Sequence, residues 1–259
     1  MIQKQRLEYL IQFLLNENSG YQEITVPQSE EEQKRLLRSL MNIRFPNPIS
    51  QDFLSIQDLY LQEELNKQKV TSIEDLSPIR KGMYLWKGDI TKLKVDAIVN
   101  AGNSALLGCF IPCHGCIDNA IHSAAGIQLR LECQQIMEKQ GIEESTGQAK
   151  ITKGYNLPSK YILHTVGPII RGTLTQNDCC MLASCYRSCL ELVEKYQLKS
   201  VAFCCISTGE FHFPNEIAGQ IAVDTVTKFL RNSNSEMEVV FNVFQQKDWN
   251  IYSRLLEEY

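Results

Sequence analysis

From about residue 80 to the C-terminus, short apolar runs alternate with amphipathic segments, and this alternation limits the possible folds more than any other feature. Helical segments are predicted at 117–140, 177–196, 214–231 and 247–257. The apolar runs are rich in β-branched and aromatic residues, as is typical of buried strands, and comprise MYLWKG, DAIVNA, KYILHTV, SVAFCCIS and EVVFNVF. The alternation predicts an α/β domain in which helices flank a central, mostly parallel sheet.

The first 75 residues differ in sequence pattern from the rest of the chain, because they contain a single glycine and show helical periodicity. Ser29 precedes EEEQKRLLRSLM and is predicted to cap a second helix, and a third helix is expected from Ser50 to about Lys67. The first helix is predicted from apolar residues at helical spacing, namely Leu7, Leu10, Ile11, Leu14 and Leu15. We therefore expect a helical N-terminal extension over 1–75, packed against a main domain over 76–259.

Composition and charge exclude several classes of protein. The net charge of −4 offers no basic surplus for long nucleic acid, although a local positive cleft for a diphosphate is compatible with it. Charges interrupt every apolar run near the N-terminus, so neither a signal peptide nor a membrane span is expected there. Ten cysteines in a chain of 259 residues do not suggest a disulfide scaffold, and we expect a cytoplasmic protein.

Ligand sites in open α/β sheets lie beyond the carboxyl ends of strands, and four segments occupy such places, namely 100–103, the cysteine-rich loop that follows it, 207–214 and 242–244. Asp89 follows the first strand in a Gly-Asp turn, and Asn100 and Asn103 bracket the end of the second. The segment 207–211, STGEF, joins a buried strand to a helix and can form a nest of backbone amides for phosphate. Ordinary turn chemistry explains each motif equally well when it is taken alone.

Taken in order, the motifs of the main domain resemble those of MacroD-type macrodomains. The resemblance runs from about Met83 to Tyr259 and is carried by KGDIT, VDAIVNAGNSALLG, IDNAIHSAAG, TGQAKITKGYNLPSKYILHTVGP, CYRSCLELVEKY and AFCCISTGEFHFP. It implies a three-layer α/β/α sandwich around a central mixed sheet. It also implies ADP-ribose binding and, as in many members of the family, removal of ADP-ribose from protein side chains.

The resemblance assigns roles to the residues that match its motifs. Asp89 would bind the adenine amine, Ile90 would contact the base through its backbone, and Asn103 would hold the distal ribose. Phe244 would pack against adenine, with Phe241 as its rival, since strand alternation places these two on opposite faces. The backbone amides of the segment 207–211 would bind the diphosphate, namely those of Ser207, Thr208, Gly209, Glu210 and Phe211.

One loop departs from the family. Where MacroD-type proteins carry a run of glycines, this chain has CFIPCHGC from Cys109 to Cys116. Thiolate and imidazole ligands together favour zinc. The loop resembles that of the zinc-dependent macrodomain branch, found beside sirtuins that ADP-ribosylate a lipoate-carrier protein, which implies Cys109, His114 and Cys116 as ligands. A closed site that includes Cys113, a redox-active Cys113–Cys116 pair and unrelated core thiols are the alternatives.

Asp118 matches a residue implicated in catalysis in the parent family, and it also starts a helix, where an acid is favourable for the dipole alone. His122 and His164 are expected to be structural, and His212 stands where relatives usually carry glycine. We therefore expect a zinc-dependent hydrolase that removes mono-ADP-ribose from proteins, in which Asn103 orients the sugar. The alternatives are a reader that binds ADP-ribose without turnover and a hydrolase of small ADP-ribose esters.

Overall fold

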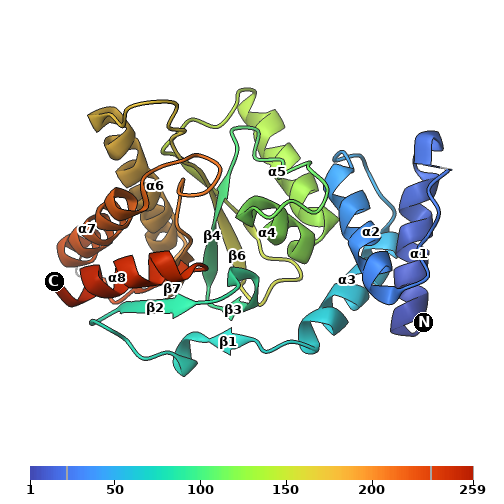
Figure 1. The fold of residues 1–259 in the computed structure, drawn as a ribbon, viewed down its shortest axis with the longest axis horizontal. Coiled ribbons are helices and arrows are strands. Elements are labelled where there is room, and N and C mark those ends of the chain that lie inside the picture. Colours follow the sequence, from blue (N-terminus) through green and yellow to red (C-terminus); the bar gives the residue numbers. More distant parts are fainter. Residues whose placement is uncertain (22, 234, 259) are drawn as a thin grey trace.

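The computed structural model describes residues 1–21, 23–233 and 235–258, and a six-stranded sheet forms its centre (Figure 1). The strands are β2 (Met83–Lys87), β4 (Ala97–Gly102), β5 (Ala149–Lys153), β6 (Tyr161–Val166), β7 (Ser200–Phe203) and β8 (Glu238–Val243). Their order is β2-β8-β7-β4-β6-β5, and all neighbours run parallel except β5 and β6. The predicted central mixed sheet is confirmed.

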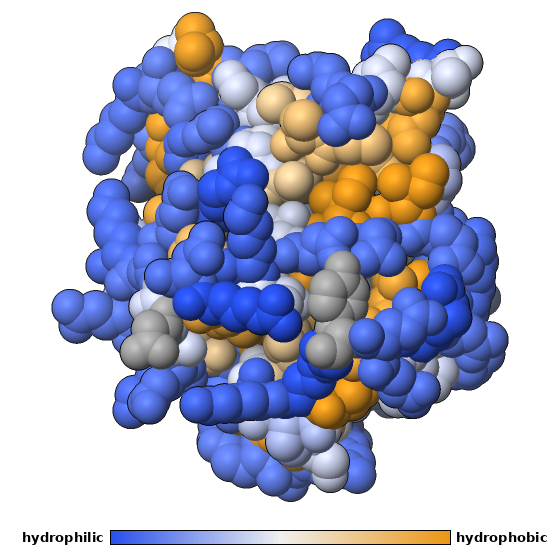
Figure 2. All heavy atoms as spheres, turned by 90° about the vertical axis from the view of Figure 1, so that its left-hand side faces the viewer, coloured by the Kyte–Doolittle hydropathy of each residue, from blue (hydrophilic) through white to orange (hydrophobic). Residues whose placement is uncertain are grey.

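Helices cover both faces of the sheet (Figure 1). One layer holds α6 (Gln176–Lys195), α7 (Asn215–Ser233) and α8 (Gln246–Glu258), and the other holds α4 (Ile117–Ala125) and α5 (Ile127–Gln140). This confirms the predicted three-layer sandwich. Figure 2 shows hydrophilic residues over much of the α6–α8 side, with an apolar area between them. None of the helices in the described part of the chain has the length and apolar character that crossing a bilayer demands.

Two details of the predicted elements are wrong. The predicted helix 117–140 is two helices, because Gly126 adopts φ 98 between α4 and α5. A side chain at that glycine would come within 2.6 Å of Gln57 Nε2, so both conformation and space require glycine. Strand β5 was not expected at all. It lies at the edge of the sheet and most of its residues are only half-buried, so it lacks an apolar run.

The N-terminal extension consists of α1 (Gln3–Asn16), the short η1 (Ser19–Tyr21), α2 (Glu30–Ile43) and α3 (Gln51–Asn66), beside the α4–α5 layer (Figure 1). All five predicted core residues of the first helix are buried in a hydrophobic cluster of these helices. Ser29 caps α2 as predicted, since its Oγ accepts a hydrogen bond of 3.2 Å from the Glu32 amide.

A short connection leads from the extension into the sandwich. It contains β1 (Thr71–Ser72) and η2 (Ile73–Asp75), and β1 pairs in parallel with β3 (Leu93–Lys94), which follows η3 (Ile90–Lys92). The predicted division of the chain at residue 75 falls in this connection and stays a prediction.

Candidate functional site

Four parallel neighbours of the sheet, β2, β8, β7 and β4, end at the same edge, and each is followed by a segment that the sequence singled out. Across this edge the order is Asp89 after β2, Phe244 after β8, the loop 207–211 after β7, and Asn103 with the cysteine loop after β4. These segments are distant in sequence. The strand order therefore arranges them as one row along the carboxyl edge of the sheet.

Asp89 and Phe244 form one end of the row. Lys87 pairs with Val243, and the Gly88 amide donates a 3.0 Å hydrogen bond to the Val243 carbonyl, so the two strands end together. The Phe244 side chain is 75% exposed. Phe241, its predicted rival, is 1% exposed and packs in the core against Tyr252 at a ring distance of 5.3 Å. Between the two rings, only that of Phe244 is available to a ligand.

The Asp89 carboxylate already has partners on its own turn. Its Oδ1 accepts hydrogen bonds from the amide and the hydroxyl of Thr91, at 3.1 and 2.7 Å, and Lys92 Nζ lies 3.3 Å from Oδ2. The Ile90 side chain is buried, so only its backbone can face a ligand. The turn thus fixes a carboxylate at the edge of the sheet, where it can accept a hydrogen bond from an amine.

The loop 207–211 has the backbone of an anion-binding nest. Ser207 and His212 both have positive φ, at 65° and 57°, and the Phe213 amide closes the loop by donating to the Ser207 carbonyl at 2.9 Å. Within the described residues, the amides of Gly209, Glu210 and Phe211 donate to no protein acceptor. Such amides favour an anion. The left-handed conformation of the exposed His212 also explains why glycine suits its position.

The structure brings Cys109, His114 and Cys116 together, with their ligand atoms all within 4.8 Å of one another. Cys109 Sγ lies 3.7 Å from His114 Nδ1. Sulfur and nitrogen ligands on one tetrahedral zinc ion stand about 3.6 Å apart, given the usual bond lengths. Cys116 is also the N-cap of α4, and its Sγ accepts a 3.4 Å hydrogen bond from the Asn119 amide. The three residues could therefore hold a metal ion.

Cys113 points away from this group. Its Sγ contacts Ser39 Oγ at 3.3 Å and the Arg35 carbonyl at 3.4 Å, both on α2, and its backbone has φ 51. The turn at Cys113 and His114 sends the two side chains in different directions. This geometry favours the three-ligand arrangement over the closed site with four ligands and over a Cys113–Cys116 pair.

His114 connects the cysteine loop with the loop 207–211. Its Nδ1 faces Cys109, whereas its Nε2 lies 3.7 Å from Glu210 Oε1. A histidine that binds a metal through one ring nitrogen commonly directs the other toward a carboxylate, which orients the ring. Glu210 was singled out only for its backbone, so sequence reasoning missed this use of its side chain.

A second group, His122, Cys133 and His164, also has its ligand atoms within 4.8 Å, but it is buried in the core. The side-chain nitrogen of Asn100 lies 3.1 Å from His164 Nδ1. Because an amide nitrogen can only donate, His164 Nδ1 accepts this hydrogen bond, and the ring proton of His164 is on Nε2. That nitrogen lies 2.9 Å from Thr152 Oγ1. Both ring nitrogens of His164 are therefore used in hydrogen bonds and neither is free to bind a metal. This favours the group in the cysteine loop as the candidate metal site.

Asp118 lies in the first turn of α4 and is 5% exposed. Burial raises its pKa to about 6, although a 2.8 Å hydrogen bond from Asn100 Nδ2 opposes that effect. Its Oδ1 is also 3.5 Å from His122 Nε2. A carboxyl group with this pKa can hold or release a proton near neutral pH.

Asn103 is held within its own turn. Its Nδ2 donates to the Gly108 carbonyl at 3.2 Å, and its Oδ1 accepts from the Ala105 amide at 3.1 Å. The side chain is half-buried just after β4, and its partner Gly108 directly precedes the cysteine loop. It therefore shapes the start of that loop as well as lining the edge of the sheet.

Comparison with known proteins agrees with this geometry. The Macro domain model matches residues 99–222. A protein-ADP-ribose hydrolase of Treponema medium is 54% identical over 99% of this chain and 100% of its own length. One from Staphylococcus aureus (strain MSSA476) is 50% identical over 96% of this chain and 94% of its own length.

Solved structures show the same resemblance. The Oceanobacillus iheyensis macrodomain with ADP is 40% identical, with a TM-score of 0.64, and the match covers 71% of this chain and 94% of that one. The Trypanosoma brucei macrodomain in complex with ADP-ribose is 32% identical, with a TM-score of 0.66, over 83% of this chain and 94% of that one.

Proposed function

This chain belongs to the macrodomain family, and we propose that it is a protein-ADP-ribose hydrolase whose reaction uses a zinc ion held by Cys109, His114 and Cys116. The hydrolase activity is that of the relatives named above. The observation that carries the zinc proposal is the convergence of the three ligand atoms of Cys109, His114 and Cys116 within 4.8 Å of one another. The contact between His114 and Glu210 places this group beside the loop 207–211.

The row of segments along the sheet edge supports one orientation of ADP-ribose. We place adenine between Asp89 and Phe244, with the Ile90 backbone beside the base. The diphosphate lies on the amides of the 207–211 loop, that is, on Ser207, Thr208, Gly209, Glu210 and Phe211. The distal ribose then reaches Asn103 and the cysteine loop, because β4 lies on the side of β7 opposite to β8.

In this orientation the site binds the distal ribose and positions its bond to the modified protein, which is the bond that hydrolysis breaks. The loop amides fix the diphosphate, and Asn103 orients the ribose, so that the reacting carbon lies beside the ligand group. Zinc, when bound there, would supply a Lewis acid and lower the pKa of a water that it binds. Asp118 would hold or release a proton beside the sugar, since its pKa of about 6 allows both near neutral pH.

The partner is a mono-ADP-ribosylated protein. On the resemblance to the sirtuin-associated branch, we propose a lipoate-carrier protein as its physiological form. The name of the relatives supports turnover of a protein substrate, and the ADP and ADP-ribose in the solved macrodomains support binding of ADP-ribose by this chain.

One assay tests the proposal and separates it from its alternatives. Wild type, Cys116→Ala and the matched control Cys113→Ala are incubated with a mono-ADP-ribosylated protein, and zinc content, retained label and hydrolysis of O-acetyl-ADP-ribose are measured. Wild type and Cys113→Ala should carry about one zinc per chain and release the label. Cys116→Ala should lose both properties.

Other outcomes identify the other functions. Binding of the modified protein without loss of label would make the chain a reader. Turnover confined to the free ester would make it an esterase of small molecules. Full activity after complete removal of metal would refute the zinc mechanism and leave the fold and the ADP-ribose cleft unaffected.

A further inference from the structure

The metal-binding loop needs support from elsewhere in the fold. Of its three ligands, Cys116 is fixed as the N-cap of α4, but Cys109 and His114 stand on irregular chain between β4 and that helix. A loop without regular structure loses conformational freedom when it adopts one ligand geometry. Side chains that hold the loop in advance therefore raise its affinity for a metal.

Arg38, on α2 of the N-terminal extension, provides such support. Its Nη2 donates to the backbone carbonyl of His114 at 3.1 Å and to Asn119 Oδ1 at 2.7 Å, and its Nε donates to the same oxygen at 3.2 Å. Asn119 in turn donates from Nδ2 to the Ile111 carbonyl at 2.9 Å. One guanidinium thus ties the backbone of a ligand residue to the first turn of α4.

Asn42, one turn further along α2, holds the strained part of the loop. Its Oδ1 accepts a 2.9 Å hydrogen bond from the amide of Cys113, the residue with φ 51, and its Nδ2 donates to Ser123 Oγ at 2.9 Å. A non-glycine residue with this backbone persists only where its surroundings fix it. The turn that directs His114 toward Cys109 is therefore fixed from the extension.

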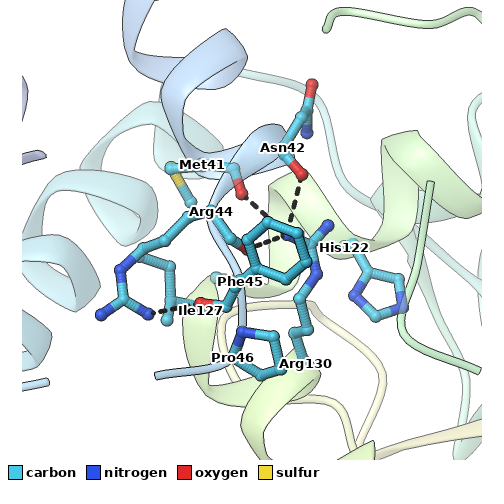
Figure 3. Close-up of a pocket in the computed structure, with 9 residues that line it drawn as sticks. Met41, Asn42, Arg44, Phe45, Pro46, His122, Ile127 and Arg130 are labelled. Carbon is cyan, nitrogen blue, oxygen red and sulfur yellow. Dashed lines mark hydrogen bonds between the residues drawn. The ribbon is translucent and has the colours of Figure 1, made fainter. Parts of the chain in front are cut away.

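The end of α2 is itself anchored to the macrodomain by Arg130 of α5 (Figure 3). Its Nη1 donates to the carbonyls of Met41, Asn42 and Arg44, at 3.1, 2.8 and 2.6 Å, and its Nε donates to the Leu107 carbonyl at 2.6 Å. These hydrogen bonds satisfy two of the last carbonyls of α2, which have no partner within the helix, and the carbonyl of its C-cap residue Arg44. They also join α2 to the start of the cysteine loop.

We propose that the N-terminal extension forms part of the metal site, with Arg38 and Asn42 as positioning residues that shape the loop 109–116 for zinc. This inference rests on the proposed function, since it concerns the same three ligands. It gives the extension a specific task beyond covering the α4–α5 layer. Zinc affinity then depends on side chains of α2 that do not contact the ion.

The test measures zinc affinity of the full chain by competition with a chromophoric chelator, for wild type, Arg38→Gln, Arg38→Lys and Arg35→Gln. Loss of a residue that orients a metal ligand lowers affinity by about 10- to 100-fold, and this is the result expected for Arg38→Gln. Arg38→Lys should lose less, because lysine keeps the charge but lacks the planar fork. Arg35→Gln removes the same charge from an exposed position of α2 and should bind zinc as wild type does.

A second measurement separates positioning from general damage. The affinity of the metal-free variants for ADP-ribose should fall much less than their affinity for zinc, because Arg38 contacts none of the adenine or diphosphate segments. Equal weakening of zinc and ADP-ribose binding, or equal loss in Arg35→Gln, would overturn the inference. Should Arg38→Gln not fold, Arg38→Lys decides, and zinc affinity equal to that of wild type then refutes the positioning role.

The same experiment distinguishes this inference from the function on which it rests. Wild-type affinity for zinc in both Arg38 variants would overturn the role of α2 alone. A wild-type protein that binds no zinc would overturn the metal site itself, and the role of α2 with it.

Discussion

Replacing Asp118 by asparagine is expected to stabilise the metal-free protein at neutral pH. The carboxyl group is 5% exposed, and burial raises its pKa from the 3.8 of a free aspartate to about 6. Each tenfold change in acidity corresponds to about 1.4 kcal/mol, so the difference between these values amounts to roughly 3 kcal/mol. An amide has the same shape and carries no charge that burial would penalise.

The sign of the effect depends on pH. Because the folded state binds the Asp118 proton more tightly than the unfolded state, the contribution of this group to stability is complete below about pH 4 and is lost as pH rises through about 6. An asparagine at this position does not ionise, so the Asp118→Asn variant keeps this stability as pH rises. The variant should therefore match wild type near pH 4 and exceed it by up to about 3 kcal/mol above pH 7.

Urea denaturation across this pH range, in the presence of a chelator, measures the difference in unfolding free energy. Asp89→Asn is the matched control, since it removes a half-exposed carboxylate that accepts two hydrogen bonds from Thr91, and it should give no stabilisation. An Asp118→Asn variant no more stable than wild type at about pH 7.5 would refute the reasoning from burial. The same variant should remove ADP-ribose more slowly, as expected of a residue that holds or releases a proton beside the sugar.

Three further predictions concern other parts of the site. Arg130→Met should lower the unfolding free energy by about 3–5 kcal/mol in urea, because buried carbonyls lose a charged donor, and a loss below about 1 kcal/mol would contradict this. Phe244→Ala should weaken ADP-ribose binding by about 10- to 100-fold in calorimetry, as expected when a ring that stacks on a base is removed, and unchanged affinity would place adenine elsewhere. Gly167→Ala should also weaken ADP-ribose binding, since its methyl carbon would collide with Ser207 Oγ in the loop 207–211. An affinity for ADP-ribose equal to that of wild type would show that this loop can move without loss of binding.

Much of the fold follows from local pattern. The apolar runs of β-branched residues gave five of the six sheet strands, and helical spacing predicted the buried face of α1. The continuous helix at 117–140 was wrong because Gly126 adopts φ 98, next to a contact that no local pattern contains. The amide of Ile127 donates to Gln57 Oε1, although Gln57 is 69 residues from Gly126 in sequence. Strand β5 escaped notice because an edge strand is only partly buried, so little apolar pattern marks it.

The candidate metal ligands were predictable in kind, because thiols and an imidazole within one short loop already limit the chemistry. Which of them converge was a matter of tertiary structure. Cys113 turns toward α2 while its neighbour His114 turns toward Cys109, and the contact with Asn42 that fixes this turn comes from a helix far away in the chain. No spacing rule contains that contact.

The sequence by itself determined the alternation of strands and helices, the buried faces and the chemical character of each loop, since these depend on neighbouring residues. Only the tertiary structure decided the strand order that sets Asp89, Phe244, the 207–211 loop and the cysteine loop in one row. It alone decided that α2 contacts the cysteine loop and that Asp118 is buried. Pairing and burial result from contacts between distant segments, and their free energies are settled only when the whole chain packs.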